Sequence, residues 1–179
     1  ALVRLGFQSA PVLDEIARVD LPRGWLAAIG QRGLAGLGFR LLAEASVRGE
    51  LEDGLAAAGA VVLSPDSRHI LRVEAGLPAA GAELSEEFTP LEAGMERAVS
   101  GDKGCYPGQE VVARSQYRGT LTRRMFLFDV GAVAQAGQEI FHSADPGQPA
   151  GVVANAAPSP AGGTWLLAEV KLAALEGGS

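Results

Sequence analysis

The only cysteine of the chain, Cys105, lies in a segment whose residue types could support thiol chemistry. Residues 103–110 read Lys-Gly-Cys-Tyr-Pro-Gly-Gln-Glu. The two glycines and the proline allow the backbone to turn sharply and to approach a ligand closely. Positive charge from Lys103 and Arg114 would favour the thiolate, the reactive form of a cysteine. Two interpretations stay open: a reactive or ligand-facing thiol, or a small apolar side chain buried in a tight turn.

Metal chemistry is not predicted for this chain. His69 and His142 have no second histidine or cysteine at ligand spacing, so we expect no metal site. Because Cys105 is single, the chain alone can form neither an internal disulfide nor a multi-cysteine zinc or iron-sulfur site. A reducing cytoplasm suits this cysteine content best.

Charge and hydropathy argue against two further classes of protein. Lysine and arginine total 15 against 21 acidic residues, and the net charge is -6. No general cationic field therefore exists to hold nucleic-acid phosphates, and direct tRNA binding is disfavoured. No run approaches the roughly 20 apolar residues that span a bilayer. We expect a cytoplasmic protein that is neither inserted into a membrane nor exported.

The elements that must position these residues follow an alternating pattern in the first half of the chain. Ser9 can cap a first helix, and Gly59 can end a second. Short apolar runs on either side of the glycine-rich stretch 32–38 are typical of strands. The expected elements are helices over 11–18 and 46–58 and strands over 25–29, 39–43 and 61–63.

A helix over residues 65–75 has the clearest signals. Ser64 can cap it, and Pro65 suits its first helical position. Asp66 favours the positive end of the helix dipole, and Gly76 can close the carboxyl end.

The last third of the chain predicts a small antiparallel β-barrel. Short apolar segments alternate there with proline and glycine turns. We place a module boundary near Arg123. The expected strands are 125–130, 139–142, 151–154 and 165–170.

Three segments carry a resemblance to known families. Residues 103–110, with the Val-Ala-Arg that follows, match the signature of the YgfZ family nearly residue for residue. Residues 71–76 (Leu-Arg-Val-Glu-Ala-Gly) and 89–95 (Thr-Pro-Leu-Glu-Ala-Gly-Met) resemble the paired motifs of the glycine-cleavage T-protein, an aminomethyltransferase that shares the fold. The resemblance extends more loosely from about residue 5 to about residue 172.

The resemblance implies an α+β fold in two parts. Residues 1–122 would form an incomplete aminomethyltransferase-like folate-binding domain, and residues 123–175 the small β-barrel. Full members of the family carry a further upstream region. We therefore expect this chain to lack the N-terminal part.

The resemblance also implies tetrahydrofolate as the cofactor. Arg68 falls where family members face the folate. Glu74 either orients the ligand or forms a structural salt bridge, and Arg114 either holds the folate tail or is a solvated charge. Arg40 stands where T-proteins place a glutamate. Because a guanidinium can only donate hydrogen bonds, this difference argues against T-protein activity.

The function implied is that of a folate-binding accessory protein, whose partners are iron-sulfur client enzymes, including enzymes that modify tRNA. Cys105 would be the functional thiol, assisted by Lys103. It would either attack a folate-linked one-carbon unit or lend a transient sulfur ligand to a client's cluster. The enzymatic alternative is a tetrahydrofolate-dependent aminomethyltransferase. The remaining residues of the motif loop are expected mainly to shape it: Gly104, Tyr106, Gly108, Gln109 and Glu110.

Overall fold

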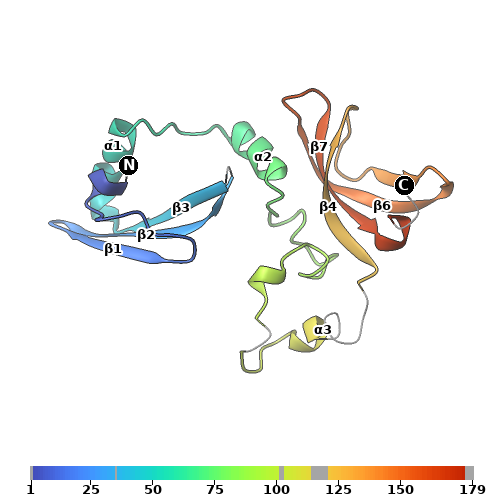
Figure 1. Cartoon of the computed structure of the whole chain (residues 1–179), viewed down its shortest axis with the longest axis horizontal. Coiled ribbons are helices and arrows are strands. Elements are labelled where there is room, and N and C mark those ends of the chain that lie inside the picture. The colour runs from blue at the N-terminus through green and yellow to red at the C-terminus, as the bar shows by residue number, and fades with distance from the viewer. Residues whose placement is uncertain (1, 35, 101–102, 114–120, 176–179) are drawn as a thin grey trace. The chain divides into compact units, whose positions relative to one another are not determined.

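The computed structural model describes residues 2–34, 36–100, 103–113 and 121–175. The chain divides into two compact units, residues 1–71 and 72–179. Each unit contains one antiparallel sheet (Figure 1). The predicted mixed helix and strand content is therefore confirmed. The division into modules at residues 122 and 123 stays a prediction.

The first unit is a three-stranded sheet with helices on one face. Strands β1 (Ile16–Leu21), β2 (Gly24–Gly33) and β3 (Gly36–Ala43) lie in the order β1-β2-β3. Leu26 and Ala28 of β2 are buried against Leu2 and Phe7. Leu51 of helix α1 (Arg48–Ala57) packs on the same cluster. The central strand therefore supplies two of the four buried residues of this cluster. Two short 3-10 helices complete the unit, η1 (Leu2–Leu5) and η2 (Ala45–Val47).

The predicted helix over residues 11–18 is wrong. Asp14 has a left-handed φ of 66°, and its N–H donates to the Gly30 carbonyl at 2.9 Å, so the segment before β1 is a turn fixed against β2. From Ile16 onward the burial alternates with a period of two, which is the period of a strand. The side chains of β1 that pack on the core are Ala17, Val19 and Leu21.

The brief buried strand predicted over residues 61–63 is also wrong. These residues adopt no regular structure, and Val61 and Val62 are 84% and 96% exposed. Apolar composition alone does not bury a segment when no element of the described chain packs against it.

The two predicted helices around this segment are confirmed as α1 and α2 (Pro65–Glu74). Ser64 Oγ accepts a hydrogen bond from the Ser67 N–H at 3.1 Å, which satisfies a free donor of the first turn. Gly76 has a φ of 65°, and its N–H donates to the Val73 carbonyl at 2.9 Å. The Leu77 N–H reaches back to the Arg72 carbonyl at 3.0 Å, which completes a Schellman motif.

The second unit contains a four-stranded antiparallel sheet in the order β4-β7-β6-β5. Its apolar face packs around buried Val153, Leu166, Ala168 and Val170. The strands confirm the four predicted segments, although β6 is much longer than expected. Their bounds are β4 (Arg123–Val130), β5 (Glu139–His142), β6 (Asp145–Pro158) and β7 (Thr164–Lys171).

The predicted closure into a barrel is not found. Among the described residues β4 and β5 do not pair, so the sheet stays open. Before the sheet, the second unit is mostly irregular and includes η3 (Glu96–Ala98) and the short helix α3 (Gln109–Ala113); η5 (Leu172–Ala174) follows β7. No helix in the described ranges is long and apolar enough to cross a membrane.

Candidate functional site

The motif loop presents its thiol to solvent. Cys105 is a free, exposed cysteine, so the alternative of a buried apolar side chain is wrong. Gly108 has a φ of 85°, a conformation that favours glycine. The Gln109 N–H donates to the Tyr106 carbonyl at 3.2 Å, and α3 begins at Gln109. Local turn geometry therefore accounts for Gly108, whereas the thiol is not buried by the described residues.

Lys103 makes a contact within the same loop. Its ammonium lies 4.4 Å from the centroid of the Tyr106 ring, a cation–π contact. Such contacts at exposed sites contribute about 0.5–1 kcal/mol. Tyr106 is half-buried, as is Gln109, whereas Gly104 and Glu110 are exposed. The pair Lys103 and Tyr106 thus gives the loop a small local stabilisation beside Cys105.

The residues predicted to contact folate are exposed where the structure describes them. Arg68 lies on α2 in the first unit and is exposed. Glu74 ends the same helix, belongs to the second unit and is exposed. Arg114 lies outside the described residues. An exposed guanidinium such as that of Arg68 suits the carboxylates of a folate tail.

Arg40 lies on the face of the first sheet that points away from the core. It pairs with Ile29 across β2 and β3, whereas Ala28 of the core pairs with Leu41. Trp25 alternates onto the same face as Ile29, and the Arg18 guanidinium carbon lies 5.1 Å from the centroid of the Trp25 ring. This face therefore combines an aromatic ring with two guanidinium groups.

Arg72 of the first T-protein-like segment forms a buried ion pair with Glu83, which follows that segment. Glu83 is fully buried, and its Oε2 lies 3.3 Å from Nη1 of Arg72, whose side chain is 15% exposed. Arg72 Nη1 also donates to the Leu77 carbonyl at 2.6 Å, and the Ala79 N–H donates to Glu83 Oε2 at 2.9 Å. Arg72 therefore ties the loop after α2 back onto the helix.

The second T-protein-like segment is one helical turn capped at both ends. Thr89 Oγ1 accepts from the Glu92 N–H at 3.3 Å, and Glu92 Oε2 accepts from the Thr89 N–H at 2.8 Å, which is a capping box. Pro90 occupies the first helical position, and its carbonyl accepts from the Met95 N–H at 2.8 Å. Gly94 closes the turn with a φ of 73°. Thr89, Pro90, Glu92 and Gly94 each stabilise this turn, which accounts for most residue types of the motif.

Arg123 joins that turn to the four-stranded sheet. Its Nη2 lies 3.4 Å from Glu92 Oε1, and its Nε lies 2.9 Å from Glu169 Oε1. The Met125 N–H also donates to the Glu92 carbonyl at 2.7 Å. Glu169 Oε1 accepts no hydrogen bond from the described residues, since the approach of Arg123 Nε is close but poorly aligned. One guanidinium therefore forms ion pairs with two carboxylates.

The two carboxylates differ in acidity. Burial acts to raise the pKa of Glu92, but hydrogen bonds from Thr89 and the charge of Arg123 outweigh burial and lower that pKa. Burial raises the pKa of Glu169, and the Arg123 charge only partly offsets it because Glu92 and Glu87 act in the same direction as burial.

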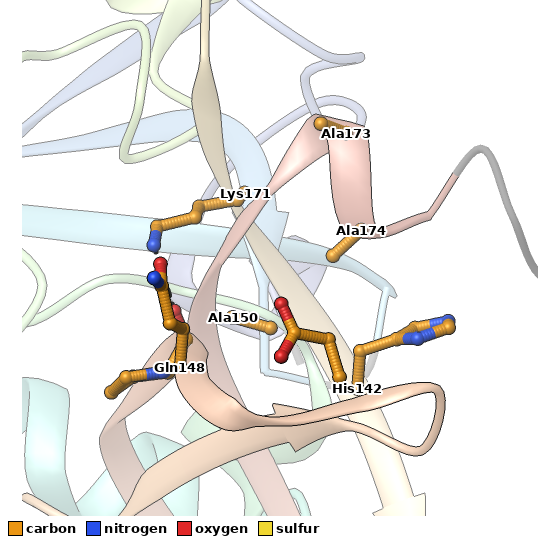
Figure 2. A pocket seen from close by; sticks show the side chains of 8 residues that line it. His142, Gln148, Ala150, Lys171, Ala173 and Ala174 are labelled. Carbon is orange, nitrogen blue, oxygen red and sulfur yellow. Dashed lines mark hydrogen bonds between the residues drawn. The ribbon is translucent and has the colours of Figure 1, made fainter.

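A cleft of about 300 Å³ in the second unit is lined by residues of β5, β6, β7 and η5 (Figure 2). Lys171 Nζ donates to the Pro149 carbonyl at 2.8 Å on one side of the cleft. His142 lies on the other side, with its ring directed away from Lys171 in Figure 2. The described residues that line this cleft include none of those predicted as functional.

Sequence reasoning missed the residues that hold the T-protein-like segments in place. The Thr-x-x-Glu spacing of Thr89 and Glu92 is a capping-box signal that could have been found in the sequence. Glu83, Arg123 and Glu169 offered no such signal, because their partners are distant in sequence.

No protein-family model matches the chain. Part of its sequence matches an aminomethyltransferase of Thermoanaerobacter sp. (strain X514), with 47% identity over 64 residues, 36% of this chain and 17% of that protein. The tRNA-modifying protein YgfZ of Serratia proteamaculans is 36% identical over 74 residues, 39% of this chain and 22% of that protein. An uncharacterized protein of Haemophilus influenzae is 46% identical over 74 residues, 38% of this chain and 26% of its own length.

The fold has a close counterpart among solved structures. The glycine cleavage system aminomethyltransferase T of Bartonella henselae superposes with a TM-score of 0.73 at 22% sequence identity, and the match covers 96% of this chain and 48% of that chain. The chain thus spans about half of this structural neighbour and about a quarter or less of the sequence relatives.

The chain therefore has the fold of an aminomethyltransferase, and part of its sequence is similar to an aminomethyltransferase. Within that class, the match to the Serratia protein confirms the resemblance to YgfZ for part of the chain.

Proposed function

We propose that this chain is a folate-binding accessory protein of the YgfZ type, which supports assembly or repair of iron-sulfur clusters in client enzymes, tRNA-modifying enzymes among them. The observation that carries the proposal is the exposed thiol of Cys105 in the Lys103–Glu110 loop, on an aminomethyltransferase-like fold. A thiol kept at the surface without a packing role is available to a partner. We place this role in the cytoplasm, where a single unpaired cysteine stays reduced.

Within this proposal, Cys105 acts as a transient ligand. After loss of its proton, the sulfur can occupy a coordination position on an exposed iron of a client's cluster and later leave it, because iron-sulfur clusters are held by thiolates. The ammonium of Lys103, held over Tyr106, keeps a positive charge in the same loop.

Tetrahydrofolate is the proposed ligand, and the first unit offers chemistry that suits it. Arg68 provides an exposed guanidinium for the carboxylates of the folate tail. The sheet face with Trp25, Ile29 and Arg40 could receive a flat heteroaromatic ring. When bound, the folate would supply its one-carbon chemistry; the residues of this chain would orient it.

Calorimetric titration with tetrahydrofolate tests the ligand. We expect Arg68→Ala to weaken binding at least tenfold, since a charge-assisted contact is lost. Cys105→Ala should bind as well as the parent protein. Arg48→Ala is the matched control, because Arg48 is an exposed helical arginine of the same unit that pairs with Glu52. Equal binding by Arg68→Ala and Arg48→Ala would contradict the assignment of Arg68.

The second candidate function is a tetrahydrofolate-dependent aminomethyltransferase. It is favoured by the 47% identity with the Thermoanaerobacter protein of that name over 64 residues. It is disfavoured by Arg40 at the position where T-proteins place a glutamate. A turnover assay with a lipoyl carrier protein and tetrahydrofolate separates the two, because only the enzyme would release ammonia from the aminomethyl carrier.

A further inference from the structure

The segment that carries Cys105 leaves and rejoins the second unit at one place. It follows η3 and precedes β4, which begins at Arg123. Arg124 Nη2 lies 2.6 Å from Glu96 Oε1, and Arg123 Nη2 lies 3.4 Å from Glu92 Oε1. Two ion pairs therefore join the chain before the cysteine segment to the chain after it. We call these four charged residues the base of the cysteine segment.

Backbone hydrogen bonds close the same junction and anchor it. The Met125 N–H donates to the Glu92 carbonyl at 2.7 Å. The start of β4 is held in the four-stranded sheet, since it pairs with β7 and the Leu172 N–H donates to the Thr122 carbonyl at 2.9 Å. The base of the cysteine segment is therefore fixed to the sheet by main-chain contacts as well as by charge.

The two ion pairs of the base differ in what else they support. Arg123 also pairs with Glu169, whose side chain is 6% exposed, so removal of Arg123 would leave a buried carboxylate without its counter-charge. The side chains of Arg124 and Glu96 are 42% and 40% exposed. Exposed ion pairs add little to the stability of a folded protein. Stability therefore gives little reason for the pair of Arg124 and Glu96, although it joins segments distant in sequence.

The pair of Arg124 and Glu96 restricts the chain that lies between its two ends. A contact that holds both ends of a segment together removes the conformations in which those ends separate. Cys105 lies between these ends, and its thiol is exposed. The base therefore limits the positions that this exposed thiol can reach.

We propose that Glu96 and Arg124 are positioning residues for Cys105. Their ion pair, beside the pair of Glu92 and Arg123, closes the base of the cysteine segment and fixes the place from which the thiol meets a partner. The consequence for client enzymes rests on the proposed function, whereas the positioning is a property of the isolated chain.

A nitroxide spin label on Cys105 measures the positioning directly, because this cysteine is the only one in the chain. We expect Arg124→Ala to make the label more mobile in its electron paramagnetic resonance spectrum. Amide hydrogen exchange in residues 103–113 should become about two- to fivefold faster, the factor by which an exposed ion pair shifts an equilibrium. The midpoint of thermal unfolding should stay close to that of the parent chain.

Exchange of the two charges separates the ion pair from a simple loss of the arginine. Glu96→Arg alone should mobilise the label, and Glu96→Arg combined with Arg124→Glu should return it to the mobility of the parent chain. Arg48→Ala is the matched control, because Arg48 and Glu52 form an exposed ion pair of 2.8 Å that spans only one helical turn. This control should leave the label unchanged.

Glu96→Gln keeps the shape of the side chain and replaces Arg124→Ala if that variant does not fold by circular dichroism. It should mobilise the label in the same way. A label that is equally mobile in the parent chain and in the folded variants would overturn the inference, as would a charge exchange that leaves the label mobile.

Rescue of client enzymes in cells is a separate measurement. Arg124→Ala should weaken rescue, and the charge exchange should recover it. Full rescue by a folded Arg124→Ala chain whose label is mobile would contradict the positioning role. If Cys105→Ala itself rescues fully, the proposed function fails, and the spin-label spectra still decide whether Glu96 and Arg124 position the segment.

Discussion

The T-protein-like segments and the cysteine loop are both motifs in the sequence, but they differ in the contacts that hold them in the structure. Residues 71–95 are tied down by a buried ion pair between Arg72 and Glu83 and by a capping box between Thr89 and Glu92. In the part of this loop that the structure describes, Lys103 makes a cation–π contact with Tyr106, a short helix follows, and the Cys105 thiol is exposed. Residues 71–95 are thus held by named partners, whereas Cys105 is exposed and has no such partner among the described residues.

Of the substitutions in these two regions, we expect the largest loss of stability at the buried ion pair. Arg72→Ala leaves the fully buried Glu83 carboxylate without its counter-charge, which typically destabilises a protein by about 3–5 kcal/mol. Urea unfolding measures the loss, and hydrogen exchange of residues 77–84 locates it. Arg68→Ala, an exposed arginine of the same helix, is the control and should change the stability by less than about 0.5 kcal/mol. Equal losses of stability for Arg72→Ala and Arg68→Ala would contradict a special role of the buried ion pair.

The next effect is expected at the capping box. Thr89→Ala removes the side chain that satisfies the Glu92 N–H, and loss of such a cap costs about 0.5–2 kcal/mol. Thr89→Ser keeps the hydroxyl and should recover most of the stability in the same unfolding assay. A serine variant as unstable as the alanine variant would show that the threonine methyl group, and not the cap, matters.

The two carboxylates that share Arg123 should give opposite pH dependence. The lowered pKa of Glu92 means that its contribution is present above its ordinary value of 4.5 and is lost as the pH falls through the folded value. The raised pKa of Glu169 means that its contribution is present below 4.5 and is lost as the pH rises through the folded value.

Unfolding free energy followed from pH 7 into the acid range checks these signs. Glu92→Gln should reduce the loss of stability at low pH, whereas Glu169→Gln should raise stability at neutral pH relative to acid pH. If both variants change the pH profile in the same direction, the assigned network around Arg123 is incorrect.

The smallest effects on stability are expected in the cysteine loop. Lys103→Ala removes a solvent-exposed cation–π contact worth about 0.5–1 kcal/mol. Lys103→Arg, which keeps a cation over Tyr106, should be close to the parent protein in thermal unfolding. A loss above about 2 kcal/mol for Lys103→Ala would show that this loop is held as firmly as residues 71–95.

The sequence predicted those features whose signals are local. Helix α2 was predicted with both its caps, because Ser64 and Gly76 act on their immediate neighbours. The order of strands in the C-terminal sheet, and the failure of its edges to pair, depend on distant contacts and could not be derived. The sequence predicts a helix over residues 11–18 because Val12, Leu13 and Ile16 fit one helical face, although the alternation from Ile16 to Leu21 has the period of a strand.

The candidate site was predictable only in part. Cys105 stood out by type and by its motif, but its exposure required the structure. Arg68 and Glu74 were placed by resemblance, and both are exposed. Arg123 could not be recognised, because the two carboxylates that it serves come from separate segments of the chain.

The central claim is that Cys105 serves a partner and not the fold. Its most direct test is rescue of iron-sulfur client activity, in cells that lack their own YgfZ-type protein, by a Cys105→Ala variant expressed at the same level as the parent chain. The account predicts loss of rescue with an unfolding midpoint equal to that of the parent. Full rescue by Cys105→Ala, or a loss of rescue explained by unfolding of the variant, would contradict it.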